Sequence, residues 1–202
     1  MGTSVHPPII AAVDQRRQIQ TLYRGAAFDV DLITWTGREG APVEKIAVRH
    51  RGAVAVIPEL PDGRLVLIRN HRATLDDWLV EFCAGGIGPG EAPVVAARRE
   101  LAEETGYVAG RIESLAAFVT TPGFSHELMQ VFVATQLEPG PPSLEPDERI
   151  EVLPMTPEAV AVAIRSGEIR DGKTIAAFHL WRERRRETGA AEEGDSRPEG
   201  EP

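Results

Sequence analysis

Residues 85–107 read GGIGPGEAPVVAARRELAEETGY, a glycine-rich loop that leads into a short predicted helix. The helix carries Glu100, Glu103 and Glu104 within little more than one turn, and Glu100 and Glu104 share a face because they are four residues apart. Like charges at that spacing repel by roughly a few tenths of a kcal/mol per pair. Mg²⁺ typically takes one or two carboxylates and completes its shell with water and substrate phosphate. The cluster therefore indicates either a cation site or an ordinary solvated helix face.

The ends and the buried face of this helix are also marked in the sequence. Pro93 suits the first turn, where its missing N–H would be unpaired anyway. Gly106 suits the end, where a residue with positive φ is needed. Val94, Ala97 and Leu101 fall at i, i+3 and i+7, so we expect them to form one apolar stripe that faces the core.

The spacing of the whole stretch decides between the two readings. Gly85 is followed by five residues, Glu91, seven residues, Arg99-Glu100-Leu101, one residue, Glu103-Glu104, one residue and Gly106-Tyr107. Apart from the apolar positions Leu101 and Tyr107, these are seven fixed identities, which at roughly 7% usage each would match by chance about once in 10⁸ start positions. The stretch resembles the box of Nudix hydrolases, which cut nucleoside diphosphates linked to another moiety; Tyr107 stands where an aliphatic residue is more usual. We expect Arg99 to hold a glutamate by bidentate hydrogen bonds.

The sequence argues against a P-loop, a nucleic-acid partner, a disulfide framework and a membrane protein. No Gly-Lys-Ser/Thr follows the glycine-rich loop, which excludes a P-loop. The net charge of −9, of which −4 lies in residues 188–202, argues against nucleic acid as a partner. One cysteine, Cys83, excludes an internal disulfide framework and is interpreted as a small buried hydrophobe. Without a membrane-length apolar run or a signal-peptide pattern, no membrane partner and a cytoplasmic location are expected.

The rest of the chain alternates strand and turn patterns. Before the box we predict strands at FDVDLITW and PVEKIAVRH, then a hairpin formed by AVAVIPE and RLVLIRNHR, whose first strand is buried on both faces. After the box come the strands RIESLAAFVT and HELMQVFVAT around the turn 122–125, and then RIEVLPM. A helix is predicted from the cap Thr156 to Gly167, and a last helix over about 173–187.

These elements predict an α/β (α+β) fold, namely the Nudix-type α/β/α sandwich: a mixed sheet covered by helices on both faces, with an N-terminal antiparallel strand extension. We divide the chain into a flexible arm at 1–17, N-terminal strands at 18–50, a Nudix hydrolase domain at 51–187 and a disordered acidic tail at 188–202. In the family such an extension packs against a second subunit and helps to form its substrate pocket, so a homodimer is expected.

The resemblance extends beyond the box and is greatest to ADP-ribose pyrophosphatases and related nucleoside-diphosphate-sugar hydrolases. It is carried by TLYRG at 21–25, HRGAV at 50–54, AG at 84–85 and PGFS at 122–125. It implies hydrolysis of ADP-ribose or a related nucleotide sugar to a nucleoside monophosphate and a sugar phosphate, with Mg²⁺ as cofactor and Mn²⁺ as the alternative ion. The alternatives for the function are another nucleotide sugar such as GDP-mannose, and a Nudix domain that binds a nucleotide sugar without turnover.

The same resemblance implies a metal site at the box. The main-chain carbonyl of Ala84 would complete it with Glu100 and Glu104, and Glu103 would be an outer or third-metal ligand. A tight turn is the plain structural role of Ala84, and the two roles are compatible. The family usually writes Pro-Ala-Gly here, whereas this chain has Cys83-Ala84-Gly85.

Substrate-binding residues are implied on the strands before the box. Arg72 would bind the pyrophosphate or the terminal phosphate. Arg69 is a weaker candidate because it has the opposite strand parity, and a surface role is the alternative for it. Lys45 and Phe28 are further substrate-binding candidates. Phe28 comes one step after the position where ADP-ribose enzymes can stack adenine on an aromatic ring, and Ala26-Ala27 precede it. The preferred base therefore stays open.

The general base is sought in the loop before RIEVLPM. Relatives often place Glu-x-Glu there, and in this chain Pro146 occupies the first of the two positions. Glu148 is therefore predicted as general base or additional metal ligand, with Glu145 as its substitute. Glu103 is kept as a third catalytic candidate. Simple solvation is the alternative for each loop carboxylate.

Overall fold

The structure is a computed structural model that describes residues 17–146 and 148–195, with side chains up to residue 188. The chain forms two compact units. One contains the strands up to His50 together with Thr121–His126, and the other contains Arg51–Thr120 and the chain from Glu127 onward. The expected arm, residue 17 excepted, and residues 196–202 of the expected tail lie outside the described residues.

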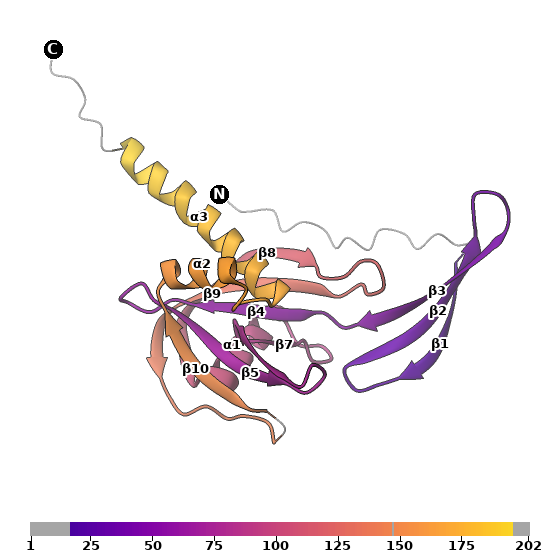
Figure 1. Ribbon diagram of the computed structural model, residues 1–202, viewed down its shortest axis with the longest axis horizontal. Coiled ribbons are helices and arrows are strands. Elements are labelled where there is room, and N and C mark those ends of the chain that lie inside the picture. The colour runs from indigo at the N-terminus through magenta and orange to yellow at the C-terminus, as the bar shows by residue number, and fades with distance from the viewer. Residues whose placement is uncertain (1–16, 147, 196–202) are drawn as a thin grey trace, which may run out of the picture. The chain divides into compact units, whose positions relative to one another are not determined.

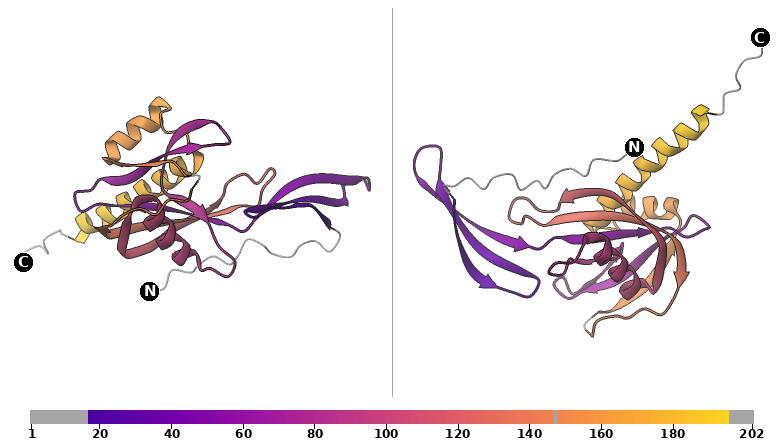
Figure 2. Two further views of the ribbon diagram at one scale, coloured as in Figure 1. Left: turned by 90° about the horizontal axis from the view of Figure 1, so that it is seen from below. Right: turned by 180° about the vertical axis from the view of Figure 1, so that it is seen from behind.

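The first unit is a three-stranded antiparallel sheet in the order β1-β2-β3, visible as one twisted ribbon in both views of Figure 2. β2 (Phe28–Thr36) and β3 (Pro42–His50) confirm the two predicted strands. β1 (Gln18–Arg24) was not predicted. Its register against β2 shifts between Thr21 and Tyr23. Such a bulge places an extra residue in the strand and breaks the alternation by which a strand is recognised.

The second unit contains two sheets. The mixed sheet has the order β7-β4-β9-β8, and the antiparallel sheet has the order β10-β5-β6. Their strands are β4 (Ala53–Pro58), β5 (Leu65–Arg72), β6 (Asp77–Glu81), β7 (Ala84–Gly86), β8 (Tyr107–Val119), β9 (Leu128–Pro139) and β10 (Ile150–Met155). β4 is buried along its whole length, as predicted, and it pairs in parallel with β9.

The predicted hairpin of β4 and β5 is wrong. The two strands belong to different sheets, and an isolated bridge between Glu59 and Leu65 links the segments around the turn. β5 pairs with β6 and β10, whereas β4 pairs with β7 and β9. β4 and the first half of β5, Leu65–Ile68, are apolar on both faces, so the sequence pattern allows either a hairpin or two central strands.

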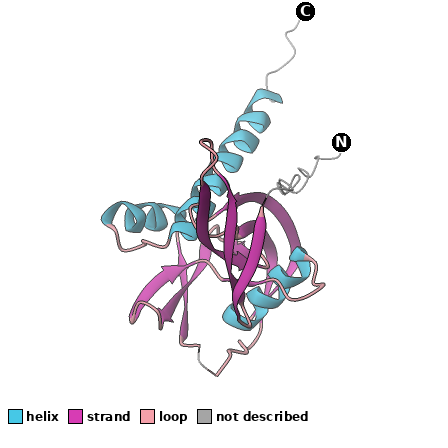
Figure 3. Cartoon of the chain, turned by 90° about the vertical axis from the view of Figure 1, so that its right-hand side faces the viewer, coloured by secondary structure: helices cyan, strands magenta, loops and turns pink. Residues whose placement is uncertain are grey.

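Helices cover both faces of the mixed sheet, as predicted (Figures 1 and 3). α1 (Pro93–Thr105) packs through Ala97 and Leu101 on the face of β4 that carries Val54 and Val56. α2 (Pro157–Ser166) and α3 (Gly172–Asp195) pack on the opposite face, where Phe178 is buried. In the described part of the chain, no helix combines the length and the apolar character needed to cross a membrane.

Most of the predicted helix ends are confirmed. Gly106 ends α1 in the left-handed region with φ 76°, and Thr156 caps α2 by accepting the Ala159 N–H at 3.2 Å. Two details are wrong. Val94 is 39% exposed and Ala96 takes its place in the core, because the buried face of α1 runs through Ala96 and Glu100. α3 continues past the predicted end near 187 to Asp195, through residues that include good helix formers.

Candidate active site

α1 places two carboxylates against the short strand β7. Glu100 is 8% exposed and Glu104 is 3% exposed. The N–H of Ala84 donates to the carboxylate of Glu104 at 3.0 Å. Glu100 lies against Gly85 so closely that a Cβ on residue 85 would lie 2.1 Å from its Cδ. The glycine therefore leaves space for the Glu100 carboxylate that a side chain at residue 85 would fill.

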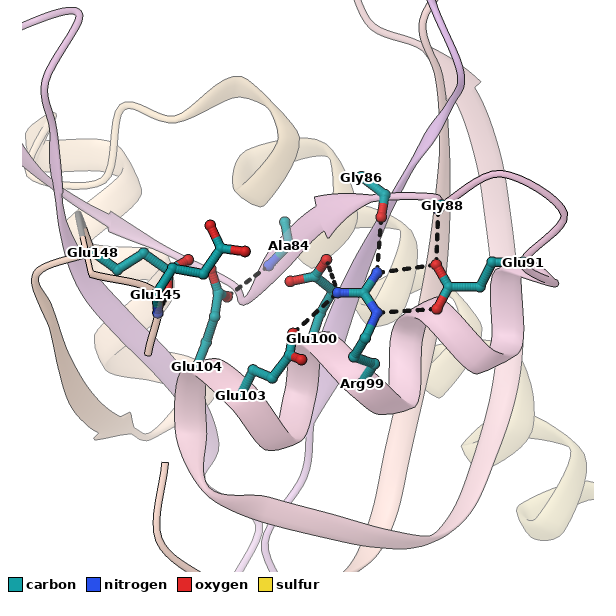
Figure 4. A network of polar contacts seen from close by, with 10 residues as sticks. All are labelled: Ala84, Gly86, Gly88, Glu91, Arg99, Glu100, Glu103, Glu104, Glu145 and Glu148. Atoms are coloured by element: carbon teal, nitrogen blue, oxygen red, sulfur yellow. Dashed lines mark hydrogen bonds and ion pairs between the residues drawn. The ribbon is translucent and has the colours of Figure 1, made fainter. Parts of the chain in front are cut away.

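Arg99 organises the other side of this cluster. Its Nε and Nη2 donate to the two carboxylate oxygens of Glu91, each at 3.0 Å, which confirms the expected bidentate contact. Its Nη1 donates to Glu100 at 2.7 Å and to Glu103 at 3.0 Å, and Nη2 also reaches the carbonyl of Gly86 at 3.0 Å. Arg99 thus fixes three glutamates and the glycine-rich loop at once (Figure 4).

Burial raises the pKa values of the two inner carboxylates. Desolvation raises the pKa of Glu104 to about 8, and the charges of Glu100 and Glu148 act in the same direction, while the Ala84 N–H and Arg72 oppose them. Desolvation also raises the pKa of Glu100, against the opposing effect of Arg99. Two buried carboxylates with raised pKa values make a site that a cation would stabilise.

The loop before β10 brings another carboxylate to this cluster. The charge of Glu148 acts to raise the pKa values of both Glu100 and Glu104. The carboxylate of Glu148 also accepts the main-chain N–H of Glu145 at 2.7 Å. Figure 4 shows Glu145 and Glu148 on the side of Glu104 away from Arg99. The structure therefore brings the candidate base and the candidate metal ligands together.

Arg72 lies at the end of β5 and is held by a residue that sequence reasoning missed. Its Nε donates to Glu81 Oε1 at 2.9 Å and its Nη2 donates to Oε2. Glu81 is 0% exposed and also accepts Lys173 Nζ. The charge of Arg72 acts to lower the pKa of Glu104. The sequence did contain one signal for Glu81: it is a lone carboxylate inside the apolar run WLVEF, and a buried charge needs a partner.

The two other substrate-binding candidates belong to the first unit. Lys45 pairs with Ile33 and Phe28 pairs with His50 in the antiparallel ladder, so the two candidates lie on opposite faces of that sheet. Both are exposed. The structure therefore does not bring them together.

Two further residues take ordinary structural roles. Arg69 pairs with Glu151 at 3.4 Å and stacks over Trp78 at 5.0 Å, so it has the surface role that was its alternative. Cys83 is buried, its Sγ donates to the Val56 carbonyl at 3.6 Å, and desolvation raises the pKa of its thiol. It is the small buried hydrophobe that was predicted.

The donor set suits a divalent ion that is completed by a substrate. Among the described residues, no group of three or more His, Cys, Asp and Glu side chains could hold a metal ion unaided. Two buried glutamates, a neighbouring main-chain carbonyl and substrate phosphates are nevertheless a typical Mg²⁺ environment. The space at Gly85 and the raised carboxylate pKa values fit such an ion.

Comparisons with known proteins agree with this geometry. The family model of the NUDIX domain matches residues 49–178. The "ADP-ribose pyrophosphatase" of Bacillus subtilis (strain 168) is 34% identical over 79% of this chain and 87% of its own length. The "GDP-mannose pyrophosphatase" of Salmonella typhimurium is 35% identical over 63% of this chain and 71% of its own. A crystal structure of an "ADP compounds hydrolase" superposes with a TM-score of 0.73 at 25% identity, covering 89% of this chain and 99% of that one.

Proposed function

The chain belongs to the Nudix family, and on that premise we propose that it hydrolyses the pyrophosphate of ADP-ribose or a related nucleoside diphosphate sugar. The products would be a nucleoside monophosphate and a sugar phosphate. The observation that carries the proposal is the pair of buried carboxylates, Glu100 and Glu104, held against Gly85 and Ala84 beside the arginine clamp.

Glu100, Glu104 and the main-chain carbonyl of Ala84 would hold the divalent ion, with Glu103 as an outer ligand. A bound Mg²⁺, or Mn²⁺ in its place, would neutralise charge at the diphosphate and lower the pKa of a bound water. Arg99 keeps Glu100 and Glu103 oriented through its hydrogen bonds to both.

The remaining side chains act on the substrate and on the attacking water. Arg72 would bind a phosphate oxygen through a charge-assisted hydrogen bond. Glu148 would orient the water or accept its proton, and Glu145 would replace it if the loop shifts. Hydrolysis then breaks the bond between one phosphorus and the bridging oxygen, and the water oxygen remains on the attacked phosphorus.

Two nucleotide sugars, ADP-ribose and GDP-mannose, are the candidate substrates for this site. We favour ADP-ribose because the relative that is matched over 87% of its own length is an ADP-ribose pyrophosphatase. A GDP-mannose pyrophosphatase is also similar, and this keeps GDP-mannose as the second candidate. A panel of both substrates with Mg²⁺ separates them by release of AMP or GMP. Tight binding without any product would favour a nucleotide-sugar binding domain instead.

We also propose that the N-terminal strands form a homodimer interface. By register, Tyr23, Phe28 and Ile46 lie on the same face of the β1-β2-β3 sheet, and they are 61%, 44% and 61% exposed. Large apolar side chains grouped on one face of a small sheet are typical of a surface that a second protein covers. Phe28 is part of that face, whereas Lys45 lies on the opposite one, so the two are kept as separate substrate-binding proposals. The single cysteine suits the reducing cytoplasm.

The direct test replaces one metal ligand. Glu104→Gln keeps the shape of the side chain and removes its charge, so turnover of ADP-ribose should fall by about two orders of magnitude or more. Glu168→Gln, at an exposed position near the end of α2, is the matched control and should retain turnover. A Glu104→Gln protein that releases AMP at the wild-type rate would refute the site.

A further inference from the structure

Glu81, at the end of β6, is the most deeply buried carboxylate among the described residues, with 0% exposure. Burial acts to raise its pKa, but the hydrogen bond from Arg72 and the charge of Lys173 hold the pKa of Glu81 below its ordinary value. It is therefore a charged group inside the protein. A buried charge is retained at a cost of several kcal/mol unless partners offset it, so its two cationic partners are part of the same arrangement.

The contact with Arg72 uses only one edge of the guanidinium. Nε and Nη2 face Glu81, whereas Nη1 has no hydrogen bond among the described residues. The side chain of Arg72 is 36% exposed, and its charge acts on Glu104. A long side chain held at one edge presents its other edge at a defined place.

Lys173 adds a second cation to Glu81 from the first turn of α3. Its Nζ contacts the Glu81 carboxylate and lies 3.0 Å from Asp171 Oδ1. Asp171 also accepts the Thr174 N–H at 2.9 Å at the start of α3, where the helix dipole offsets part of its charge. Glu81 is thus shared between two cations, which leaves the Arg72 guanidinium with more attraction for an anion than a simple ion pair would have.

The start of α3 is fastened to the strand end that carries Glu81. The N–H of Phe82 donates to the Thr174 hydroxyl at 2.9 Å, and that hydroxyl donates to Asp171 at 2.6 Å. Lys173 and Glu81 are therefore fixed relative to each other by main-chain and side-chain bonds. Glu81 is the last residue of β6, and Ala84 begins β7 three residues later.

We propose that Glu81, supported by Lys173, is a positioning residue for substrate binding: it holds Arg72 by one edge of the guanidinium and leaves the other edge open for a phosphate oxygen of the diphosphate. The inference rests on the proposed function. Glu81 and Lys173 act through Arg72 and do not touch the reacting atoms.

The test is a double-mutant cycle between Glu81→Gln and Arg72→Ala, with kcat and KM for ADP-ribose measured separately. If Glu81 acts through Arg72, Glu81→Gln raises KM about ten- to a hundredfold, and adding it to Arg72→Ala causes little further loss. A purely structural role would lower kcat with KM unchanged and would add its full loss to Arg72→Ala; that result overturns the proposal. Glu151→Gln, which breaks the exposed pair with Arg69 on the neighbouring strand β5, is the control.

A second variant and a binding measurement complete the test. If Glu81→Gln fails to fold, Lys173→Met decides, because it leaves the Arg72–Glu81 contact in place: it should raise KM about three- to tenfold, and an unchanged KM overturns the proposal. Binding of a methylene-bridged ADP-ribose analogue, measured by calorimetry, distinguishes failure of the proposed function from failure of the positioning role of Glu81. Wild-type protein that neither binds it nor hydrolyses ADP-ribose refutes the proposed function, whereas wild-type binding that Glu81→Gln leaves unchanged refutes only the positioning role.

Discussion

The carboxylate of Glu100 rests against the Cα of Gly85. A Cβ at residue 85 would lie 2.1 Å from Glu100 Cδ and 2.4 Å from Oε2. The conflict is with the end of a side chain, so Glu100 can move away without disturbing the backbone. Glycine at this position therefore serves the placement of one carboxylate more than it serves the stability of the fold.

Gly85→Ala should consequently separate activity from stability. We expect turnover of ADP-ribose to fall by about two orders of magnitude, because the displaced Glu100 no longer meets the ion, while the melting temperature changes by only a few degrees. Gly86→Ala is the matched neighbour, since a Cβ there meets nothing within 4 Å, and it should retain activity within about twofold. Equal activity of Gly85→Ala and wild type would show that turnover does not depend on the position of the Glu100 carboxylate.

Arg99→Lys tests the clamp on the glutamates. Lysine keeps the charge but cannot form the bidentate contact with Glu91 while also reaching Glu100 and Glu103. We expect kcat to fall about tenfold or more, and stability to fall by about 1 kcal/mol because the site is partly exposed. Steady-state kinetics and thermal melts measure the two effects. Arg186→Lys, on the exposed side of α3, should leave both unchanged.

The raised pKa of Glu104 predicts how the metal-free protein responds to pH. Its folded-state pKa of about 8 lies above the ordinary value of 4.5, so the folded state binds the proton more tightly. That contribution to stability is fully present below pH 4.5 and is lost as the pH rises toward about 8. Melting temperatures in EDTA should therefore decline across this window more steeply for wild type than for Glu104→Gln. Mg²⁺ should remove most of the difference, and parallel curves in EDTA would contradict the assignment.

Ile46→Glu tests the proposed homodimer. A charge in the middle of an apolar interface is strongly unfavourable, so the mass by light scattering should fall to that of one chain. Val162→Glu is the control, because Val162 is also exposed, at 54%, but lies on α2. A wild-type protein that is monomeric and active would end this proposal.

The sequence predicted best what depends on residues close together in the chain. The spacing of Glu100 and Glu104, the caps at Gly106 and Thr156, and the bidentate role of Arg99 are all local, and the structure confirms the geometry of each. Local rules act over a few residues, where periodicity and capping determine the backbone.

What failed depends on distant partners. β4 and residues 65–68 of β5 are apolar on both faces, so nothing local selects a hairpin over partners in β9 and β10. Glu81 was missed because its second cation, Lys173, is 92 positions away in the sequence. A carboxylate in an apolar run indicates that it has partners in the fold, but it does not identify them.

The most direct test of the central claim is a crystal of the protein with Mn²⁺ and a methylene-bridged ADP-ribose analogue, in which anomalous scattering locates the ion. We predict that the ion lies between a diphosphate oxygen, the carboxylates of Glu100 and Glu104, and the carbonyl of Ala84. An ion or a diphosphate bound elsewhere, with those three groups turned away from both, would contradict the account.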